Sequence, residues 1–464
     1  MRSRSLPEPD WVRWLRAAAT ISFLAVSASG ALGASRMLLH ATLLRSTPAA
    51  DSRLHEPPET IRLVFSERVV PELSQITLVR PDSVSAQLKV TSDPHDARTL
   101  VGQVAGSEFR EGKYKVTWRV VSADGHAIGG SFVFSLEPRG GVSGPRAVSI
   151  VGKPSRDSAA LRPYDVPSHM PGSDERSVPV LASLLRGVGL GALMMGIGSL
   201  FFGSTAGEHR SLMPGTLVIS LTGVGALLLV IHGIAWLHHL SPTGHLSRDY
   251  MVSMLGSTLG RVELLRIVLA LLTFLAIAIA RRPALALAFG TVCLLVSGAV
   301  GHPAAIHPFV AIPAKMIHLV SASIWLGGLV WLVWLAHCDH AACRIEATRV
   351  SSIALISIIA IFLSGLLQAV LFLSTPGDLI HSNYGLLVLA KLIGLAILVG
   401  FGAYNRFGLL PRLDASDGAR KLARSVKQEI AIVTTVILIG GFLAYVPTPP
   451  VPQTALPEPE GIER

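Results

Sequence analysis

The stretch from residue 114 to residue 136, YKVTWRVVSADGHAIGGSFVFSL, holds two runs that alternate between apolar and polar side chains. The first run places one apolar set on a single face, namely Tyr114, Val116, Trp118 and Val120. The second run repeats the pattern with Phe132, Phe134 and Leu136. Alternation with a period of two is typical of strands with one buried face. The sequence therefore predicts a pair of strands joined by a corner, Asp124-Gly125-His126.

Neighbouring segments extend this pattern to a whole domain. The run TIRLVFSERV, residues 60–69, alternates Ile61, Leu63 and Phe65 with polar neighbours. Several short strands of this kind predict an all-β, immunoglobulin-like sandwich or barrel over residues 40–138. The three cysteines of the chain, Cys293, Cys338 and Cys343, all follow this region, so the β domain is expected to fold without disulfides.

Two segments that flank the β domain have other signatures. Arg2, Arg4, Arg13 and Arg16 precede an apolar run with small residues after it, which predicts a secretory signal peptide over residues 1–39. The alternative is an uncleaved signal anchor. Residues 139–177 are rich in Gly, Pro, Ser and Arg and lack periodicity, so they are expected to form a linker.

The rest of the chain is strongly apolar. Half of all residues are hydrophobic, 15% are charged and the mean hydropathy is +0.53, values typical of a membrane protein. Apolar segments close to the roughly 20 residues that a helix needs to cross a bilayer predict an all-α membrane domain over residues 178–447, followed by a tail, 448–464. We expect eight spans, at residues 178–203, 213–237, 261–280, 283–301, 309–336, 351–373, 384–404 and 428–446.

The distribution of basic residues predicts the orientation. An exported β domain puts the start of the first span outside, and eight spans return the tail to the same side. Loops assigned to the inside then carry most of the arginine and lysine: Arg210, Arg281, Arg282, Arg344, Arg349, Arg406, Arg412, Arg420, Lys421, Arg424 and Lys427. The outer loops and tail carry Arg248 and Arg464. This bias fits the positive-inside rule, so the net charge of +10 reflects insertion in the inner membrane and not nucleic-acid binding.

The β domain resembles the CopC family of periplasmic copper-binding proteins. The resemblance rests on HATLLRSTPAADSRL at residues 40–54, PPETIRLVFSERV at 57–69 and YKVTWRVVSADGHAIGGSFVF at 114–134. It implies a Cu(II) site made by the amine and imidazole of a first mature residue, His40, and completed by Asp124 and His126. Signal cleavage near residues 31–35 would leave extra residues ahead of His40, so the amine ligand depends on the cut site.

The corner residues suit copper on their own chemistry. Cu(II) favours tetragonal nitrogen and oxygen ligands, and Gly125 allows a turn in which Asp124 and His126 face one point. The alternative is a plain hairpin turn, the commonest use of Asp-Gly. No methionine lies between His40 and Pro138, which excludes a thioether site there, and His55 and His95 are expected on the surface.

The membrane region resembles the CopD family of inner-membrane copper proteins, through AKMIHLVSASIWLGGLVWL at 314–332, NYGLLVLAKLIGLAILVGFGAYNRF at 383–407 and GHPAAIHP at 301–308. The resemblance implies movement or handling of copper at the inner membrane. Ionisable residues within spans invite a functional interpretation. His318 and His302, which lie in the stretches that carry the resemblance, and His232 form the predicted copper path, with Cu(I) as the hypothetical species. The alternative for each histidine is a packing or interfacial role.

Two further groups remain open from sequence. Arg186, Arg266, Lys315 and Lys391 lie in the outer halves of spans, where they are expected either to pair with Glu263 or to bind an anion. The segment HCDHAAC contains His337, Cys338, His340 and Cys343, which could receive Cu(I) or could be clustered by chance.

We therefore expect a copper-binding membrane protein, not an enzyme, that captures Cu(II) outside and passes copper across the inner membrane. Its expected partners are copper ions, the lipid bilayer and periplasmic copper proteins. No nucleic acid partner is expected, because the basic residues follow the membrane orientation. No nucleotide partner is expected, because no G-x-x-x-x-G-K-[ST] loop is present. The alternatives are a haem- or quinone-linked redox protein that reduces copper, and copper resistance by sequestration without transport.

Overall fold

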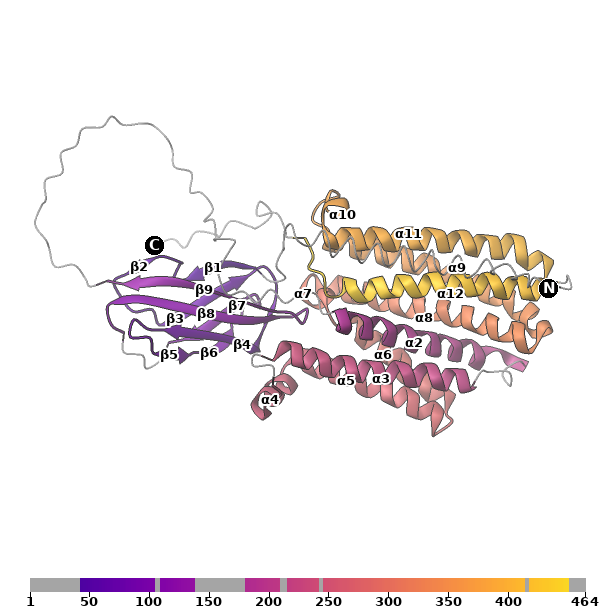
Figure 1. The fold of residues 1–464 in the computed structure, drawn as a ribbon, viewed down its shortest axis with the longest axis horizontal. Helices are drawn as coiled ribbons and strands as arrows, with labels where there is room; N and C mark the ends of the chain where they lie inside the picture. The colour runs from indigo at the N-terminus through magenta and orange to yellow at the C-terminus, as the bar shows by residue number, and fades with distance from the viewer. Residues whose placement is uncertain are drawn as a thin grey trace, which may run out of the picture. The chain divides into compact units, whose positions relative to one another are not determined.

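The computed structural model describes residues 42–104, 109–137, 180–208, 215–241, 245–413 and 417–449. The predicted signal peptide 1–39, His40, the linker 139–177 and the tail from residue 450 lie outside the described residues. Contacts within the chain separate two compact units, one of strands and one of helices, and the corner Ala123–His126 belongs to the helical unit. Figure 1 labels the elements of both.

The unit of strands is a two-sheet sandwich, which confirms the predicted all-β class. One sheet has the order β1-β3-β7-β6 and the other has the order β2-β9-β8-β4-β5. The first sheet contains β1 (Leu43–Thr47), β3 (Thr60–Phe65), β7 (Thr99–Gln103) and β6 (Lys89–Ser92). The second contains β2 (Arg53–Leu54), β9 (Ala127–Leu136), β8 (Gly112–Ser122), β4 (Val69–Val79) and β5 (Ser85–Gln87).

The predicted strand pair is β8 and β9, which run antiparallel in continuous register from Gly112↔Leu136 to Val121↔Ala127. The alternation read from sequence matches the burial: Tyr114, Val116 and Val120 have no exposed surface and Trp118 is 8% exposed. Ile61, Leu63 and Phe65 of β3 are equally buried and face the same core. Because the register runs unbroken to Val121↔Ala127, only residues 122–126 remain to make the corner.

The helical unit contains the long helices of the predicted membrane domain, which run roughly parallel to one another (Figure 1). Their bounds are α2 (Val180–Thr205), α3 (Gly215–Leu240), α5 (Thr258–Ala278), α6 (Pro283–Gly298), α8 (Pro308–Cys338), α9 (His340–Phe372), α11 (Asn383–Ala403) and α12 (Gly418–Leu443). Short elements join them: α4 (Arg248–Gly256), α7 (His302–Ala305), α10 (Asp378–His381), a π-helical segment (Tyr404–Leu409) and a 3-10 turn (Leu410–Arg412).

Six of the predicted spans are confirmed as helices long and apolar enough to cross a membrane. The other two fall on α5 and α6. Helix α5 begins with three charged residues, Arg261, Glu263 and Arg266, and α6 is apolar but has only 16 residues. All eight predicted segments are helical, and the number of actual crossings stays a prediction.

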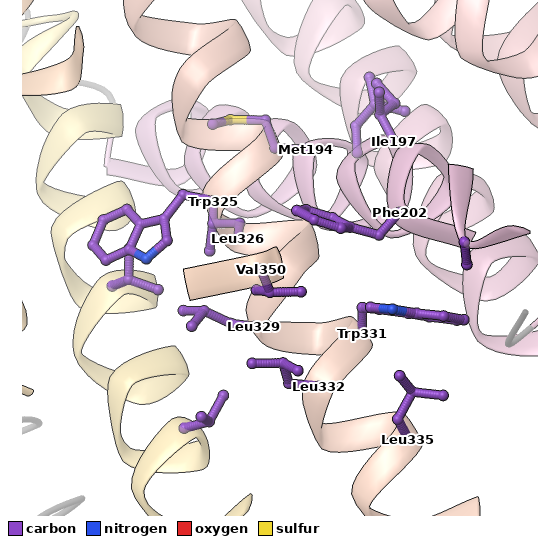
Figure 2. Packing of buried hydrophobic residues seen from close by; sticks show 14 of the residues in the cluster. Met194, Ile197, Phe202, Trp325, Leu326, Leu329, Trp331, Leu332, Leu335 and Val350 are labelled. Atoms are coloured by element: carbon purple, nitrogen blue, oxygen red, sulfur yellow. The ribbon is translucent and has the colours of Figure 1, made fainter. Parts of the chain in front are cut away.

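The packing centre of the helical unit is the contact between α2 and α8. A Cβ atom added to Gly327 would overlap the backbone of Gly198 and Ser199, so the two helices touch through their main chains. Ser323 Oγ donates to the carbonyl of Met194 at 2.8 Å across the same contact. Small residues that let backbones meet are typical of helix contacts in membranes. Around it lies an apolar cluster shown in Figure 2, with Met194, Ile197, Phe202, Trp325, Leu326, Leu329, Trp331, Leu332, Leu335 and Val350 labelled.

We predict that Gly327→Ala destabilises the helical unit. The added methyl group would overlap the backbone of α2, which cannot move aside as a flexible side chain could. The expected cost is at least the roughly 1–3 kcal/mol typical of overpacking. Gly400→Ala on α11 is the matched control, since a Cβ there meets nothing within 4 Å. Thermal unfolding of the two purified variants in detergent measures the difference. Equal melting temperatures would contradict the packing described here.

Candidate functional site

The corner between β8 and β9 holds the predicted acid and imidazole side by side. Gly125 has a φ of +93°, in the left-handed region that glycine adopts without strain. The backbone N–H of His126 donates to Asp124 Oδ1 at 3.1 Å, and His126 Nδ1 lies 3.0 Å from the same oxygen. Asp124 is 5% exposed and His126 is 7% exposed. The two side chains therefore form one buried polar group.

This corner contacts residues of the helical unit, to which it belongs. Asp124 Oδ2 lies 3.4 Å from His302 Nδ1, so the carboxylate reaches one imidazole with each oxygen. Trp236 Nε1 donates to the carbonyl of Gly125 at 3.3 Å. The ring of His126 stands edge-on to Tyr445, with ring centroids 5.6 Å apart. The predicted soluble ligands and one predicted membrane histidine are thus neighbours.

His302 is placed by the tight connection between α6 and α8. It is the first residue of α7, directly after Gly301, whose φ of +86° turns the chain. His302 Nε2 lies 2.8 Å from the carbonyl oxygen of Val446, beyond the end of α12. Each ring nitrogen of His302 therefore has a partner, a carboxylate on one side and a backbone carbonyl on the other.

His232 lies in a different part of the same buried polar network. Its Nε2 is 2.6 Å from Tyr445 Oη and its Nδ1 is 3.1 Å from Arg266 Nη2. Arg266 has no exposed surface and also pairs with Glu263. Since a guanidinium only donates, it bonds to the lone pair of Nδ1, which leaves the proton of a neutral imidazole on Nε2 for Tyr445.

His318 stands apart from the other two histidines. It is half-buried on α8, and its Nδ1 lies 3.1 Å from Ser364 Oγ on α9. Among the described residues, no ring contact or hydrogen bond joins His318 to His232 or His302, while Tyr445 lies between His232 and the corner. The three predicted path residues are therefore not assembled into one cluster.

No group of three or more His, Cys, Asp or Glu side chains is arranged to hold a metal ion in the ranges that the structure describes. At the corner, the rings of His126 and His302 are 6.3 Å apart and tilted by 38°, so they contact Asp124 without converging on one point. His40, the predicted third ligand, lies outside the described residues. The described residues therefore do not by themselves form a complete set of metal ligands at the corner.

The remaining sequence candidates have ordinary surroundings. His55 and His95 are exposed, which confirms the prediction for both. In the HCDHAAC segment, Cys338 is exposed while Cys343 is fully buried and directed toward the carbonyl of Leu332. His337 is engaged by Lys427 Nζ at 3.2 Å. The thiols therefore point to different environments, which favours clustering by chance.

Sequence reasoning missed Tyr445 and Trp236, the two aromatic residues that contact the corner. Tyr445 follows the last helix and Trp236 lies near the end of α3. Neither belongs to a motif, and an aromatic residue at the end of a span is commonly an interfacial anchor. The only available signal was their shared position near predicted outer ends of spans.

A β-sandwich domain joined to a bundle of membrane-length helices defines a fused, multi-pass class of membrane protein. Residues 43–137 match the CopC domain family, and residues 346–443 match the family described as copper resistance protein D, or CopD. Through its β domain the chain belongs to the CopC family, and it joins that domain to a region that matches CopD.

Three relatives cover different parts of the chain. Copper transport protein CutJ of Bacillus subtilis is 26% identical over 447 residues, which span 90% of this chain and 76% of CutJ. Copper resistance protein C of Pseudomonas syringae pv. tomato is 36% identical over 125 residues, 25% of this chain and 95% of the relative. Inner membrane protein YebZ of Escherichia coli is 29% identical over 241 residues, 49% of this chain and 80% of the relative.

We predict that Glu263→Gln strongly destabilises the helical unit, because it leaves the guanidinium of Arg266 buried without its counter-charge. Breaking such a pair from one side costs about 3–5 kcal/mol. The double variant Glu263→Gln/Arg266→Gln should recover part of this loss, since both charges are then gone. Thermal unfolding in detergent measures all three proteins. An unchanged melting temperature for Glu263→Gln would show that the pair does not neutralise Arg266.

Proposed function

We propose that this protein captures Cu(II) at the Asp124–His126 corner and passes copper through the membrane domain. The observation that carries the proposal is the position of Asp124, whose two oxygens contact His126 and His302. One carboxylate thus contacts two imidazoles within the same unit, one from the corner and one from α7. Copper is the substrate in this scheme.

The chemistry of these groups supports copper over a harder ion. Two imidazoles and a carboxylate form a nitrogen-rich set of ligands. Such a set binds Cu(II) more tightly than the other first-row divalent ions. CutJ, which matches 90% of this chain, carries copper transport in its name. Copper resistance protein C, which matches 25% of the chain, carries copper resistance in its name. The proposal adds His40 as a further ligand, through its imidazole and, where cleavage frees it, its amine.

Beyond the corner, we place His302 first on the path. Its Nε2 donates to the carbonyl of Val446, so a neutral ring keeps the lone pair of Nδ1 on the side of Asp124, where it can take a metal ion from the carboxylate. His318 is a better later ligand than His232, because both nitrogens of His232 are committed to Tyr445 and Arg266. His318 is bonded through Nδ1 to Ser364 Oγ, and the proposal assigns its Nε2 to copper. Cu(I) suits such a site, and its oxidation state there is part of the proposal.

The orientation proposed is the one predicted from the positive-inside rule, with the β domain and the tail outside. Copper then enters from the side of the corner and leaves on the side of the basic loops. The sequence contains no G-x-x-x-x-G-K-[ST] nucleotide-binding loop that could drive this step. In this scheme a gradient of copper or of a second ion therefore supplies the energy.

We predict that Asp124→Asn and His126→Ala each weaken Cu(II) binding by the purified full-length protein by at least about tenfold. Loss of a mere hydrogen-bond partner of a metal ligand already costs about 10–100-fold in affinity. His55→Ala and His95→Ala are the matched controls, because both side chains are exposed. Competition titration against a chelator of known affinity measures the change. Wild-type affinity in both corner variants would remove the corner from the site.

We predict that His302→Ala slows copper uptake into proteoliposomes more than it weakens Cu(II) capture, because the residue accepts copper from the corner. His307→Asn is the control, since His307 is exposed and asparagine tolerates its left-handed backbone, with a φ of +48°. Radioactive copper accumulation and equilibrium binding are measured on the same preparations.

These assays also separate the rival functions. Copper binding without uptake in the wild-type protein would indicate sequestration in place of transport. A Soret band in the absorbance spectrum of the purified protein would favour the redox alternative, which needs paired imidazoles on a haem iron.

A further inference from the structure

Two cationic side chains from different helices meet beside Gly301. Measured from the position that a Cβ atom of Gly301 would occupy, Lys315 Nζ of α8 lies 3.7 Å away and Arg186 Nη2 of α2 lies 3.8 Å away. Apart from the chain neighbours of the glycine, no other described atom lies within 4 Å of that position. A Cβ atom there would thus lie at ordinary van der Waals distance from an ammonium and a guanidinium nitrogen that come from two helices.

The bonds of these two cations go to neutral groups. Lys315 Nζ donates to the carbonyl of Val300 at 2.6 Å, and the guanidinium of Arg186 lies 6.0 Å from the ring centroid of Tyr445. Within the described part of the chain, no carboxylate forms an ion pair with either of them. Their charge is therefore not neutralised by a direct partner.

The buried acids Asp124 and Glu263 are already in use. Asp124 lies against His126 and His302. Glu263 pairs with Arg266 and lies 3.4 Å from His232 Nδ1. Arg266 is itself fully buried, and its Nε has no hydrogen-bond partner. Glu263 thus pairs with Arg266, and neither Arg186 nor Lys315 shares that ion pair. Charged side chains within spans are costly to insert, and like charges in a low dielectric add to that cost.

We propose that the space beside Gly301 binds a small monovalent anion of the size of chloride, held by Arg186 and Lys315. An anion there faces a guanidinium and an ammonium, which both donate hydrogen bonds to it. Gly301 is suited to the position because it lacks a side chain that would fill the space, while its φ of +86° excludes most other residues.

The position of the anion gives it a role next to the predicted copper path. Gly301 is bonded in the chain to His302, so the anion lies beside the residue that receives copper in the proposed function. It offsets the positive charge that would otherwise repel a copper cation from His302. The binding of the anion itself does not rest on copper transport and is testable without copper.

Thermal unfolding of the purified full-length protein in detergent tests the site. Chloride is titrated against gluconate at constant ionic strength and without copper. The expected result is a saturable rise in Tm of about 2–4 °C with chloride. Arg186→Gln and Lys315→Gln should each abolish the rise. Lys391→Gln should keep it, because this half-buried lysine borders a different glycine, Gly440, at 3.6 Å from its Cβ position.

A second measurement avoids the variants, in case they fold poorly. Broadening of the ³⁵Cl NMR line by wild-type protein should appear and should be reversed by bromide. No chloride-specific change in Tm or line width would overturn the proposal, as would a full response in Arg186→Gln and Lys315→Gln together. Stabilisation by phosphate and not by chloride would also overturn it, since a lipid headgroup or free phosphate would then be the occupant.

Discussion

A guanidinium with no exposed surface inside a bundle of apolar helices must be neutralised by the bundle itself, and the rest of the polar interior is arranged around this need. Glu263 provides the counter-charge to Arg266 from one turn away on α5. The same pair engages His232 on α3, and through it Tyr445 beyond α12. One buried charge therefore joins α5, α3 and the segment after α12. It also commits His232 to this network, so that His232 is less open to a ligand.

The β domain was largely predictable from sequence because its signal is local. Period-two alternation in residues 114–136 predicted both strands and their buried face, and the unbroken register of β8 and β9 confirms it. The helical segments were predictable for a related reason, since length and apolarity are properties of single segments. The number of crossings was not settled in the same way, because α5 begins with three charges and α6 is short.

The candidate site was predictable only where its residues share a motif. Asp124 and His126 are separated by one glycine, so a single turn brings them together. Their contacts with His302 and Tyr445 depend on packing between segments far apart in the chain, which periodicity cannot report. The same limit explains the basic residues. Sequence placed Arg186 and Lys315 in spans, but only the structure brings their nitrogens to one glycine.

The contact of α2 with α8 through Gly198 and Gly327 has a mechanical consequence. Two helices whose main chains touch cannot slide along each other without collision. Helices α2 and α8 therefore behave as one rigid unit within the membrane domain. Any rearrangement of the bundle must then come from the helices around this contact. On α11, a Cβ atom added to Gly400 or Gly402 would meet no neighbour within 4 Å, and a π-helical segment follows the helix, so this end of α11 is less tightly packed than the α2–α8 contact.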